Sequence, residues 1–192
     1  LLLPLYCIAV QPYTPTLGDP VVEPWRWRHE TDLDNLNILC MDEAENGTFW
    51  FGCVGGIVQY DGTRVEKITF SEELLKKIMS LKDVPWAKAL TVRPNGDLLV
   101  LIGESLVLRH GEEWEVVVQN VGESVFTARL VDGVGGDIWL GVPDGLWRIP
   151  ADGSSSSQVM TPSMRQGLKS LCRDSAGDIW VVEKTGLVSS RL

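Results

Sequence analysis

The hydrophobic residues of this chain occur in short bursts that are separated by polar turns containing glycine. A typical unit has an apolar run at Leu39–Met41, a polar turn ending in Gly47 and a second apolar run at Phe49–Phe51. Two β-rich segments joined by a tight glycine turn predict a β-hairpin, because glycine adopts the positive φ of such a turn without steric cost. The pattern therefore predicts strands along most of the chain.

The second run of each unit is apolar on successive residues and not on alternate ones, as in Ile138–Leu140. Such a strand must be covered on both faces, so its sheet is expected to lie between two other sheets. A further turn, such as the one at Gly56, starts a third strand. A looser fourth strand follows, for example at residues 64–70 and 114–119.

This unit occurs four times, and each copy has an anchor glycine just before its second strand. The anchors are 49, 40 and 41 residues apart: Gly47, Gly96, Gly136 and Gly177. Four short antiparallel strands at a period of roughly 40 to 45 residues are typical of a propeller blade. We therefore predict an all-β fold, a β-propeller with about four blades of four antiparallel strands, as a closed small ring or as part of a larger propeller. Three second strands carry a tryptophan that is expected to pack between blades: Trp50, Trp139 and Trp180.

One stretch, residues 71–80, departs from the strand pattern. It begins with Ser71, continues with two acids and then two lysines, and places apolar residues at helical spacing. A serine N-cap, early acids and later lysines favour a helix. A short helix inserted between the first and second blades also accounts for the longer spacing of 49 residues.

The N-terminal region differs from the repeat. Residues 1–10 are apolar but too short to span a bilayer, and they are interpreted as the remnant of a signal peptide, with an N-terminal apolar strand as the alternative. Residues 11–24 hold four of the ten prolines and are typical of an extended linker. The blades are expected over residues 25–192. The signal-like start favours a periplasmic or secreted location.

Composition and charge limit the classes of partner. The 192 residues include 17 Lys and Arg against 26 Asp and Glu, a formal net charge of −9. Since affinity for nucleic acids comes largely from cationic side chains, we expect no nucleic-acid partner. Apolar residues at 44% and charged residues at 22% are ordinary for a globular domain.

Few residues suggest catalysis or metal binding. The four cysteines lack zinc-ligand spacing, so buried free thiols are expected, with one disulfide as the alternative in an oxidising compartment: Cys7, Cys40, Cys53 and Cys172. His29 and His110 have no Ser, Cys or second His near them in sequence. We therefore predict no catalytic residue, no metal and no cofactor.

The acidic residues are interpreted as structural or solvated. Neighbouring carboxylates at turns or on the helix are expected to be solvated charges: Asp42 and Glu43, Glu72 and Glu73, Glu112 and Glu113. Asp97, Asp137 and Asp178 each follow an anchor glycine. A residue that recurs at one turn position is expected to bond the turn backbone, because a catalytic residue is needed only once.

The repeat also resembles a known family. The pattern Asp-x-x-Gly-Asp-Ile-Trp-(Leu/Val)-Gly-x-x-x-Gly-Leu, read from Asp132–Leu146 and Asp174–Leu187, is similar to the two-component regulator propeller repeat, as is the lead-in at Trp25–Asn37. The resemblance covers roughly residues 25–192. Members are typically periplasmic sensor regions of hybrid histidine kinases with seven-bladed propellers, and many in gut bacteria sense oligosaccharides. The resemblance implies a ligand-sensing or interaction role for this propeller.

Four blades leave the assembly of a ring open. A closed four-bladed ring, an open partial ring and a dimer that completes an eight-bladed ring all fit the sequence, as does a larger propeller with further blades. Trp25–Glu30 is a candidate outer strand for a closing blade. Unpaired blade faces would expose apolar strands, so self-association is an expected interaction.

Propeller geometry predicts where a ligand binds. Turns between second and third strands, and connections between blades, open on one face around the central channel. An aromatic side chain with polar neighbours there would suit an oligosaccharide or another small ligand. The candidate ligand-binding residues are Trp86, Glu104, Asp144, Arg165, Glu183 and Lys184. Packing of Trp86 against the end of the inserted helix is the alternative for that residue.

These observations favour a non-catalytic propeller module that senses a ligand or binds a partner outside the cytoplasm. Two alternatives remain. The run Gly177–Glu183 is also similar to streptogramin-lyase-type propellers, an enzyme class that requires a channel histidine–glutamate arrangement and a divalent metal, whereas the anchor motifs contain no histidine. The other alternative is a truncated scaffold with no independent activity.

Overall fold

The computed structural model describes residues 29–79, 83–121, 128–142, 145–151, 157–159, 168–183 and 186–190. The chain divides into two compact units, Leu1–Asp34 and Asn35–Leu192. The described part of the first unit holds one short 3-10 turn, η3 (Thr31–Leu33). The predicted segments 1–10 and 11–24 lie outside the described residues, as does most of the candidate closing strand, whose last two residues, His29 and Glu30, are not in a strand.

The described strands of the second unit form four antiparallel sheets, which are the expected blades. Blade 1 consists of β1 (Ile38–Glu43), β2 (Phe49–Cys53), β3 (Gly56–Tyr60) and β4 (Val65–Ile68). Blade 2 consists of β5 (Ala87–Val92), β6 (Leu98–Ile102), β7 (Ser105–His110) and β8 (Glu113–Val118). Blade 3 consists of β9 (Arg129–Asp132), β10 (Ile138–Val142), β11 (Gly145–Ile149) and β12 (Ser157–Val159). Blade 4 has three described strands, β13 (Leu168–Arg173), β14 (Ile179–Glu183) and β15 (Gly186–Ser190).

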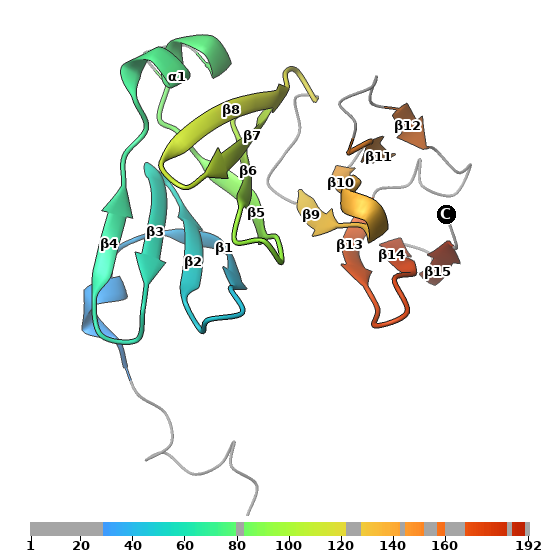
Figure 1. The fold of residues 1–192 in the computed structure, drawn as a ribbon, viewed down its shortest axis with the longest axis horizontal. Helices are drawn as coiled ribbons and strands as arrows, with labels where there is room; N and C mark the ends of the chain where they lie inside the picture. The colour runs from blue at the N-terminus through green and yellow to red at the C-terminus, as the bar shows by residue number, and fades with distance from the viewer. Residues whose placement is uncertain are drawn as a thin grey trace, which may run out of the picture. The chain divides into compact units, whose positions relative to one another are not determined.

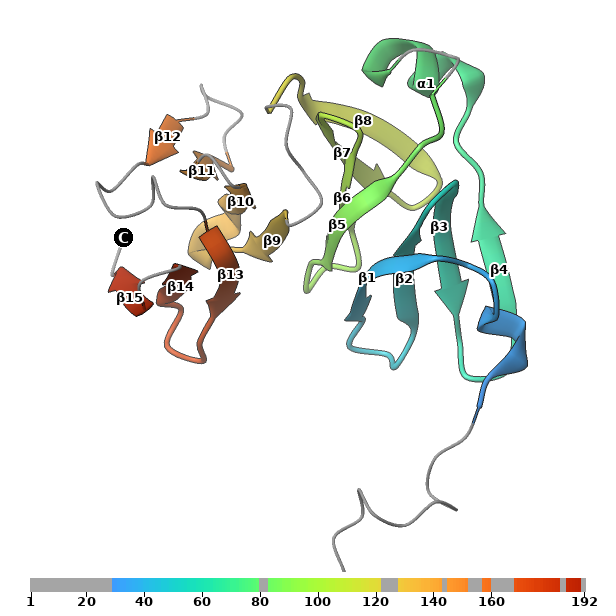
Figure 2. The ribbon, with the colours of Figure 1, turned by 180° about the vertical axis from the view of Figure 1, so that it is seen from behind.

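Within each sheet the strands are hydrogen-bonded in chain order, so every blade is a meander. The first strands β1, β5, β9 and β13 lie toward the centre of the second unit, and β4, β8 and β12 lie outward (Figures 1 and 2). Neighbouring blades contact one another mainly through these inner strands, β1 with β5, β5 with β9 and β9 with β13. The predicted all-β propeller architecture is therefore confirmed.

The hairpin between the first and second strands turns at the anchor glycine in every blade. The backbone φ at this glycine is positive in all four copies: Gly47 82°, Gly96 87°, Gly136 88° and Gly177 91°. A residue with a Cβ atom rarely adopts this conformation, so the repeat of glycine in the sequence reflects one repeated turn. In blade 3 the turn includes a second 3-10 element, η4 (Val134–Gly136).

The predicted inserted helix is present as α1 (Glu72–Ile78). Ser71 is its N-cap, and the hydroxyl oxygen of Ser71 accepts a hydrogen bond from the Leu74 N–H at 3.2 Å. Leu74 and Ile78 are buried in the cluster that also contains core residues of blades 1 and 2. The helix therefore covers the end of the contact between these two blades (Figure 1).

Among the described residues the core forms three clusters, one between each pair of neighbouring blades. All five residues of β6 and all five of β10 are buried, as expected for strands covered on both faces. Trp50 of blade 1 is 7% exposed and shares a cluster with residues of blade 2. Trp139 of blade 3 is 4% exposed and shares a cluster with residues of blade 4. Both tryptophans therefore lie in the core between neighbouring blades.

The two aspartates that open the sequence motif have different positions and different partners. Asp174 lies three residues before its anchor glycine, and its carboxylate accepts hydrogen bonds from Trp180 Nε1 at 2.7 Å and from the backbone N–H of Asp178 at 2.9 Å. Asp132 lies four residues before Gly136 and binds Arg93 of blade 2 instead. The place equivalent to Asp174 is occupied in blade 3 by Gly133, where an added Cβ would lie 2.7 Å from Trp139 Nε1. Treating the two aspartates as one motif position was therefore wrong.

Candidate functional site

The inner strands of all four blades line one central pocket of about 570 Å³. Its walls come from β1, β5, β9 and β13 and from the first residues of the hairpins that follow β1 and β5. The lining contains both apolar and charged side chains. The charged members are Asp42, Glu43, Glu45, Arg93, Arg129, Asp132 and Arg173.

Two of these charged groups join neighbouring blades. The Asp42 carboxylate of β1 accepts hydrogen bonds from Thr91 Oγ1 at 3.0 Å and from the Val92 N–H at 2.8 Å, both on β5. Arg93 donates from Nε to Asp132 Oδ1 at 2.9 Å and from Nη2 to the Gly136 carbonyl at 2.9 Å. Asp42 is thus a half-buried structural group, which corrects the prediction that it is a solvated charge.

A thiol and a guanidinium lie near each other in this pocket. Burial raises the pKa of the Cys40 thiol to about 11, while the positive charge of Arg129 opposes that rise. Cys40 Sγ also donates to the Ala87 carbonyl at 3.5 Å. The Cys40 thiol is therefore neutral near neutral pH and acts as a small apolar group rather than as a nucleophile.

Two arginines and two glutamates supply the remaining charges. Arg129 begins β9 and Arg173 ends β13, and within the described part of the chain neither forms an ion pair with a carboxylate. Glu43 and Glu45 lie on β1 and its hairpin and likewise have no ion-pair partner among the described residues. Arg129 Nη1 does donate to the Ala128 carbonyl at 2.8 Å. Guanidinium and carboxylate groups without an ion-pair partner can bind the hydroxyl, carboxylate or amine groups of a polar molecule.

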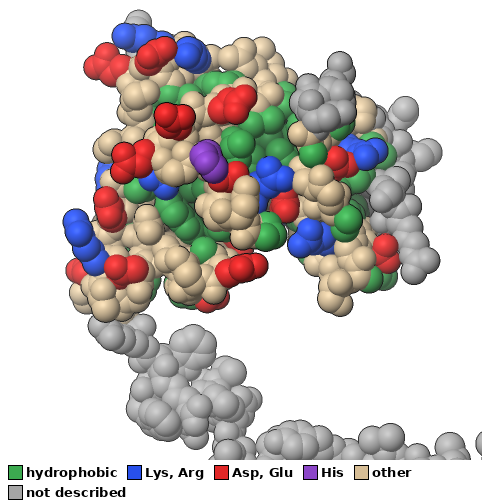
Figure 3. Space-filling view, in the orientation of Figure 1, with side chains coloured by type: hydrophobic (Ala, Val, Ile, Leu, Met, Phe, Trp, Pro, Cys, Tyr) green, Lys and Arg blue, Asp and Glu red, His purple; other side chains and the backbone are tan. Residues whose placement is uncertain are grey.

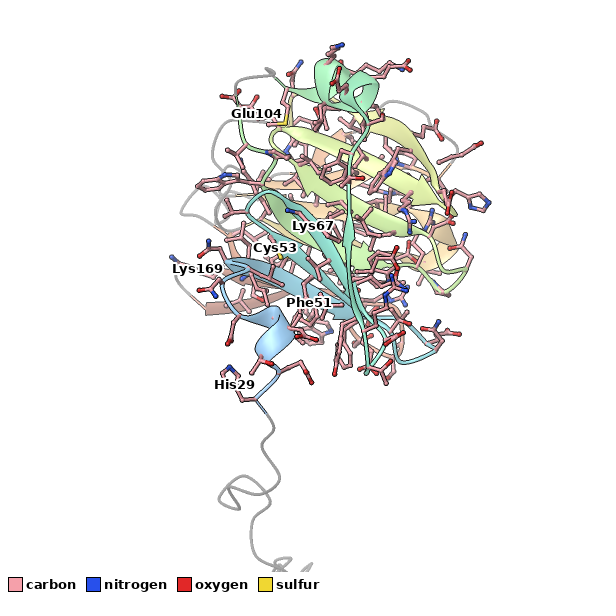
Figure 4. The ribbon with its side chains drawn as sticks, turned by 90° about the vertical axis from the view of Figure 1, so that its left-hand side faces the viewer. His29, Phe51, Cys53, Lys67, Glu104 and Lys169 are labelled. Atoms are coloured by element: carbon pink, nitrogen blue, oxygen red, sulfur yellow. The ribbon has the colours of Figure 1, made fainter. Side chains whose placement is uncertain are left out.

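The structure brings together only some of the predicted ligand-binding residues. Trp86 forms an isolated β-bridge with Val54, and its carbonyl accepts the Gly103 N–H at 3.3 Å. Next to this turn, burial lowers the pKa of the Lys88 ammonium, and the negative charge of Glu104 opposes that lowering. Glu104 lies toward the same end of the blades as α1 (Figure 4). Trp86 and Glu104 therefore lie near each other, and neither lines the central pocket.

The other predicted site residues stay untested. Asp144, Arg165 and Lys184 lie outside the described residues, and Glu183 is described only as the backbone end of β14. The pocket residues that the sequence interpretation missed lie on the first strand of each unit. Those strands were identified by their apolar residues. A charged residue recurs at the end of three of them and is the sequence feature that could have indicated the pocket: Glu43, Asp132 and Arg173.

The histidines and the anchor aspartates lie outside this pocket. Among the described lining residues there is no histidine. His110 Nδ1 lies 2.6 Å from Asp97 Oδ1, and Arg148 Nε donates to Asp137 Oδ2 at 2.6 Å. The Asp97 carboxylate also accepts a hydrogen bond from Asn95 Nδ2 at 2.7 Å, and the Asp137 carboxylate accepts one from the Ala151 N–H, after β11, at 3.1 Å. These contacts join each aspartate to the third strand or to the residue that follows it. No group of three His, Cys, Asp or Glu side chains suited to a metal ion occurs in the described ranges.

Charge on the surface is mixed. Acidic and basic side chains are interspersed on the face displayed in Figure 3, with hydrophobic side chains between them. Among the described residues, no helix has the length and apolar character required to cross a membrane.

Comparison with known proteins shows which solved structures have a similar fold. No protein-family model matches the chain. No curated protein matches it by sequence. Among solved structures, the chain is similar to the extracellular domain of a putative hybrid two-component system from B. thetaiotaomicron, with a TM-score of 0.59 and 16% identity over 81% of this chain and 20% of that one. A second extracellular domain of this kind from the same organism matches with a TM-score of 0.58 and 17% identity, over 84% of this chain and 23% of that one.

The chain is also similar to virginiamycin B lyase from Staphylococcus aureus, with a TM-score of 0.59 and 12% identity over 83% of this chain. It spans 57% of the length of the lyase chain, so all three matches cover only part of the known structures. The neighbours confirm the propeller fold and include the extracellular domains that the sequence motif resembled. Identities of 12–17% support the fold and leave the function to be argued from the site.

Proposed function

We propose that this chain is a non-catalytic, ligand-binding propeller module of an extracytoplasmic sensor, and that it holds a small polar molecule such as an oligosaccharide in the central pocket. The observation that carries the proposal is the pocket itself. A volume of about 570 Å³ lies within the range of small-molecule sites, and four blades contribute to its walls. The similarity to extracellular domains of two-component systems supports the sensory and extracytoplasmic parts of the proposal.

The lining suits a polar ligand with both hydroxyl-like and charged groups. Arg129 and Arg173 are exposed cations on blades 3 and 4, while Glu43 is an exposed acid on blade 1. Apolar neighbours such as Leu39 and Met41, which are 41% and 60% exposed, provide surface for the carbon skeleton of a sugar. Binding would therefore combine hydrogen bonds to the charged side chains with van der Waals contact to the apolar ones, as is usual for small-molecule sites.

A thermal-shift screen with neutral and acidic oligosaccharides tests this function. A ligand present at about 100 times its Kd stabilises the fold by about 2.7 kcal/mol, which corresponds to a rise in Tm of about 5–10 °C for a chain of this size. We expect Arg129→Ala to abolish the rise and Lys67→Ala, on β4 away from the pocket, to retain it. A sugar-dependent rise that is equal in wild type and Arg129→Ala would contradict the central pocket as the site.

The same screen separates the alternatives. If Trp86→Ala loses the ligand-dependent rise in Tm and Arg129→Ala keeps it, the ligand binds near Trp86 and Glu104 and not in the central pocket. Stabilisation by divalent ions without any sugar response would favour a lyase-like activity, for which the structural similarity to virginiamycin B lyase is the supporting observation. No response to either class would favour a scaffold without a ligand.

A further inference from the structure

A second, smaller pocket lies beside the central one, between the first hairpins of blades 1 and 2. Its volume is about 280 Å³, and its walls come from the hairpin that joins β1 to β2, from the hairpin that joins β5 to β6, and from Trp50 of β2 and Gln59 of β3. Both hairpins lie at the same end of their blades (Figures 1 and 2). We call this cavity the side pocket.

The side pocket adjoins the central pocket. Five residues line both cavities: Ala44, Glu45, Val92, Arg93 and Pro94. Two of these shared residues are charged. Arg93 is already held by Asp132 and by the Gly136 carbonyl. The Glu45 side chain is exposed and forms no hydrogen bond or ion pair within the described part of the chain. A molecule in the central pocket can therefore reach the side pocket past the Glu45 carboxylate.

The side pocket contains polar groups with unused hydrogen-bonding capacity. Gln59 is half-buried and lies directly opposite Trp50 in the pairing of β2 with β3, and its side-chain amide forms no hydrogen bond in the described ranges. Thr48 is only 8% exposed, and its hydroxyl has no hydrogen-bond partner among those residues either. Buried polar groups of folded proteins are usually hydrogen-bonded. An amide offers both donors and an acceptor, so it suits a ligand whose hydroxyl groups do the same.

The remaining lining favours an uncharged ligand group over an anion. Trp50 is 7% exposed, and the Arg109 guanidinium carbon lies 5.4 Å from its ring centroid, so Trp50 supplies an apolar floor and not an open ring face. Arg93 is the one cation in the described lining, and its Nε and Nη2 groups are bonded within the protein. Glu45 adds negative charge, which repels a carboxylate or a sulfate.

We infer that the side pocket is a subsite for one uncharged sugar unit, and that the ligand of the central pocket is an oligosaccharide that extends into it past Glu45. The inference rests on the proposed function, since it takes the central pocket as the main site. Gln59 exchanges hydrogen bonds with the hydroxyl groups of that unit, so the protein recognises the length of the sugar chain. These hydrogen bonds are expected to lower Kd about three- to tenfold.

Isothermal titration calorimetry with sugars of increasing length tests the inference. The probes are linear gluco-, xylo- and manno-oligosaccharides of one to five units. In a series that binds, we expect one step in length at which Kd falls about three- to tenfold, because the added unit enters the side pocket. Oligogalacturonates of the same lengths, whose units are acidic, are expected to lack this step.

A pair of glutamine variants assigns the step to the side pocket. Gln59→Ala is expected to lose the step and to keep the wild-type Kd for the shorter sugars, which occupy only the central pocket. That retained affinity also shows that the variant is folded. Gln119→Ala is the matched control and is expected to keep the step, because Gln119 is exposed and lines neither pocket.

The outcomes separate this inference from the proposed function. Binding that does not depend on length, a step that Gln59→Ala leaves unchanged, an equal weakening by Gln59→Ala at every length, or a step confined to the oligogalacturonates would overturn the subsite and leave the proposed function standing. If no sugar of any series binds, the proposed function itself fails, and the subsite fails with it.

Discussion

At the scale of single residues, hydrogen-bond partners decide what each repeated polar residue does. Asp174 accepts hydrogen bonds from the Trp180 indole and from its own turn, and these bonds hold the pKa of its carboxyl below the usual value, with the Trp180 bond as the largest cause. Asp132, which looks equivalent in sequence, pairs with Arg93 in the neighbouring blade. The local motif did not distinguish the two roles, because the partners lie in different strands.

Replacing Asp174 with alanine is expected to lower the Tm at neutral pH, because the Trp180 indole and the turn N–H groups lose their acceptor. A carboxyl whose pKa is lowered on folding stabilises the native state above its unfolded pKa, and this contribution is lost as the pH falls through the folded pKa. The difference in Tm between wild type and Asp174→Ala is therefore expected to be full above about pH 5 and to narrow below about pH 4. Thermal melts across this range measure it.

Ser175→Ala, in the same turn, is the control for this prediction. Ser175 is exposed, so its loss is expected to leave the Tm unchanged at every pH. A difference in Tm between wild type and Asp174→Ala that does not depend on pH would show that the carboxylate charge is not what stabilises the turn.

At the scale of elements, the hairpin between the first and second strands is the repeated part of the fold. Its glycine has positive φ in each blade, so an alanine there costs about 1–2 kcal/mol from the backbone alone. The surroundings differ between copies. A Cβ at Gly47 would have nothing within 4 Å, whereas at Gly177 it would lie near Val134 Cγ2 of the neighbouring hairpin.

Gly177→Ala is therefore expected to destabilise the protein more than Gly47→Ala, although the backbone cost is the same. Urea denaturation of both variants measures the difference. Adding Val134→Ala to Gly177→Ala is expected to remove most of the excess, because the contacting methyl group is gone. Equal destabilisation by the two glycine variants would show that the hairpins of blades 3 and 4 do not pack as described.

The ion pair between Arg93 and Asp132 is expected to contribute to the joining of blades 2 and 3. Their side chains are 19% and 12% exposed, so solvent screens the pair only weakly. A double-mutant cycle with Arg93→Ala and Asp132→Ala is expected to give a coupling free energy of about 2 kcal/mol. The same cycle on the exposed helical pair Glu72 and Lys76 is expected to give about 0.5 kcal/mol or less. Similar values in both cycles would argue against a stabilising inter-blade pair.

At the scale of the whole molecule, the equivalent inner-strand residue of each blade differs in how deeply it is buried. Leu90, Leu130 and Leu171 are buried between blades, whereas Met41 is exposed. Each of the three Leu→Ala variants is expected to lose about 2–5 kcal/mol of unfolding free energy. Met41→Ala is expected to lose less than about 1 kcal/mol, because Met41 is 60% exposed. Urea denaturation of the four variants tests this, and a loss at Met41 as large as at the leucines would mean that Met41 packs against another surface.

Much of the architecture followed from the sequence. The anchor glycines, the runs of successive apolar residues and the serine before α1 predicted the hairpins, the sheets covered on both faces and the inserted helix. These features are set by local backbone geometry and by the need to bury an apolar strand, and both are readable within a few residues. The candidate site was less predictable. The sequence interpretation proposed Trp86 and Glu104 as ligand-binding residues and missed the charged pocket, which neither of them lines.

The blade is encoded locally in the chain, because turn chemistry and hydrophobic pattern repeat every 40 to 49 residues. The convergence of the charged residues depends instead on how the folded blades pack. Asp42 meets Thr91 from 49 positions away, and Arg93 meets Asp132 from 39 positions away. Hydrophobic periodicity assigns a residue to a face of its own strand, but it carries no information about which distant side chain lies opposite. The pocket and the inter-blade pairs therefore follow from the way the blades pack.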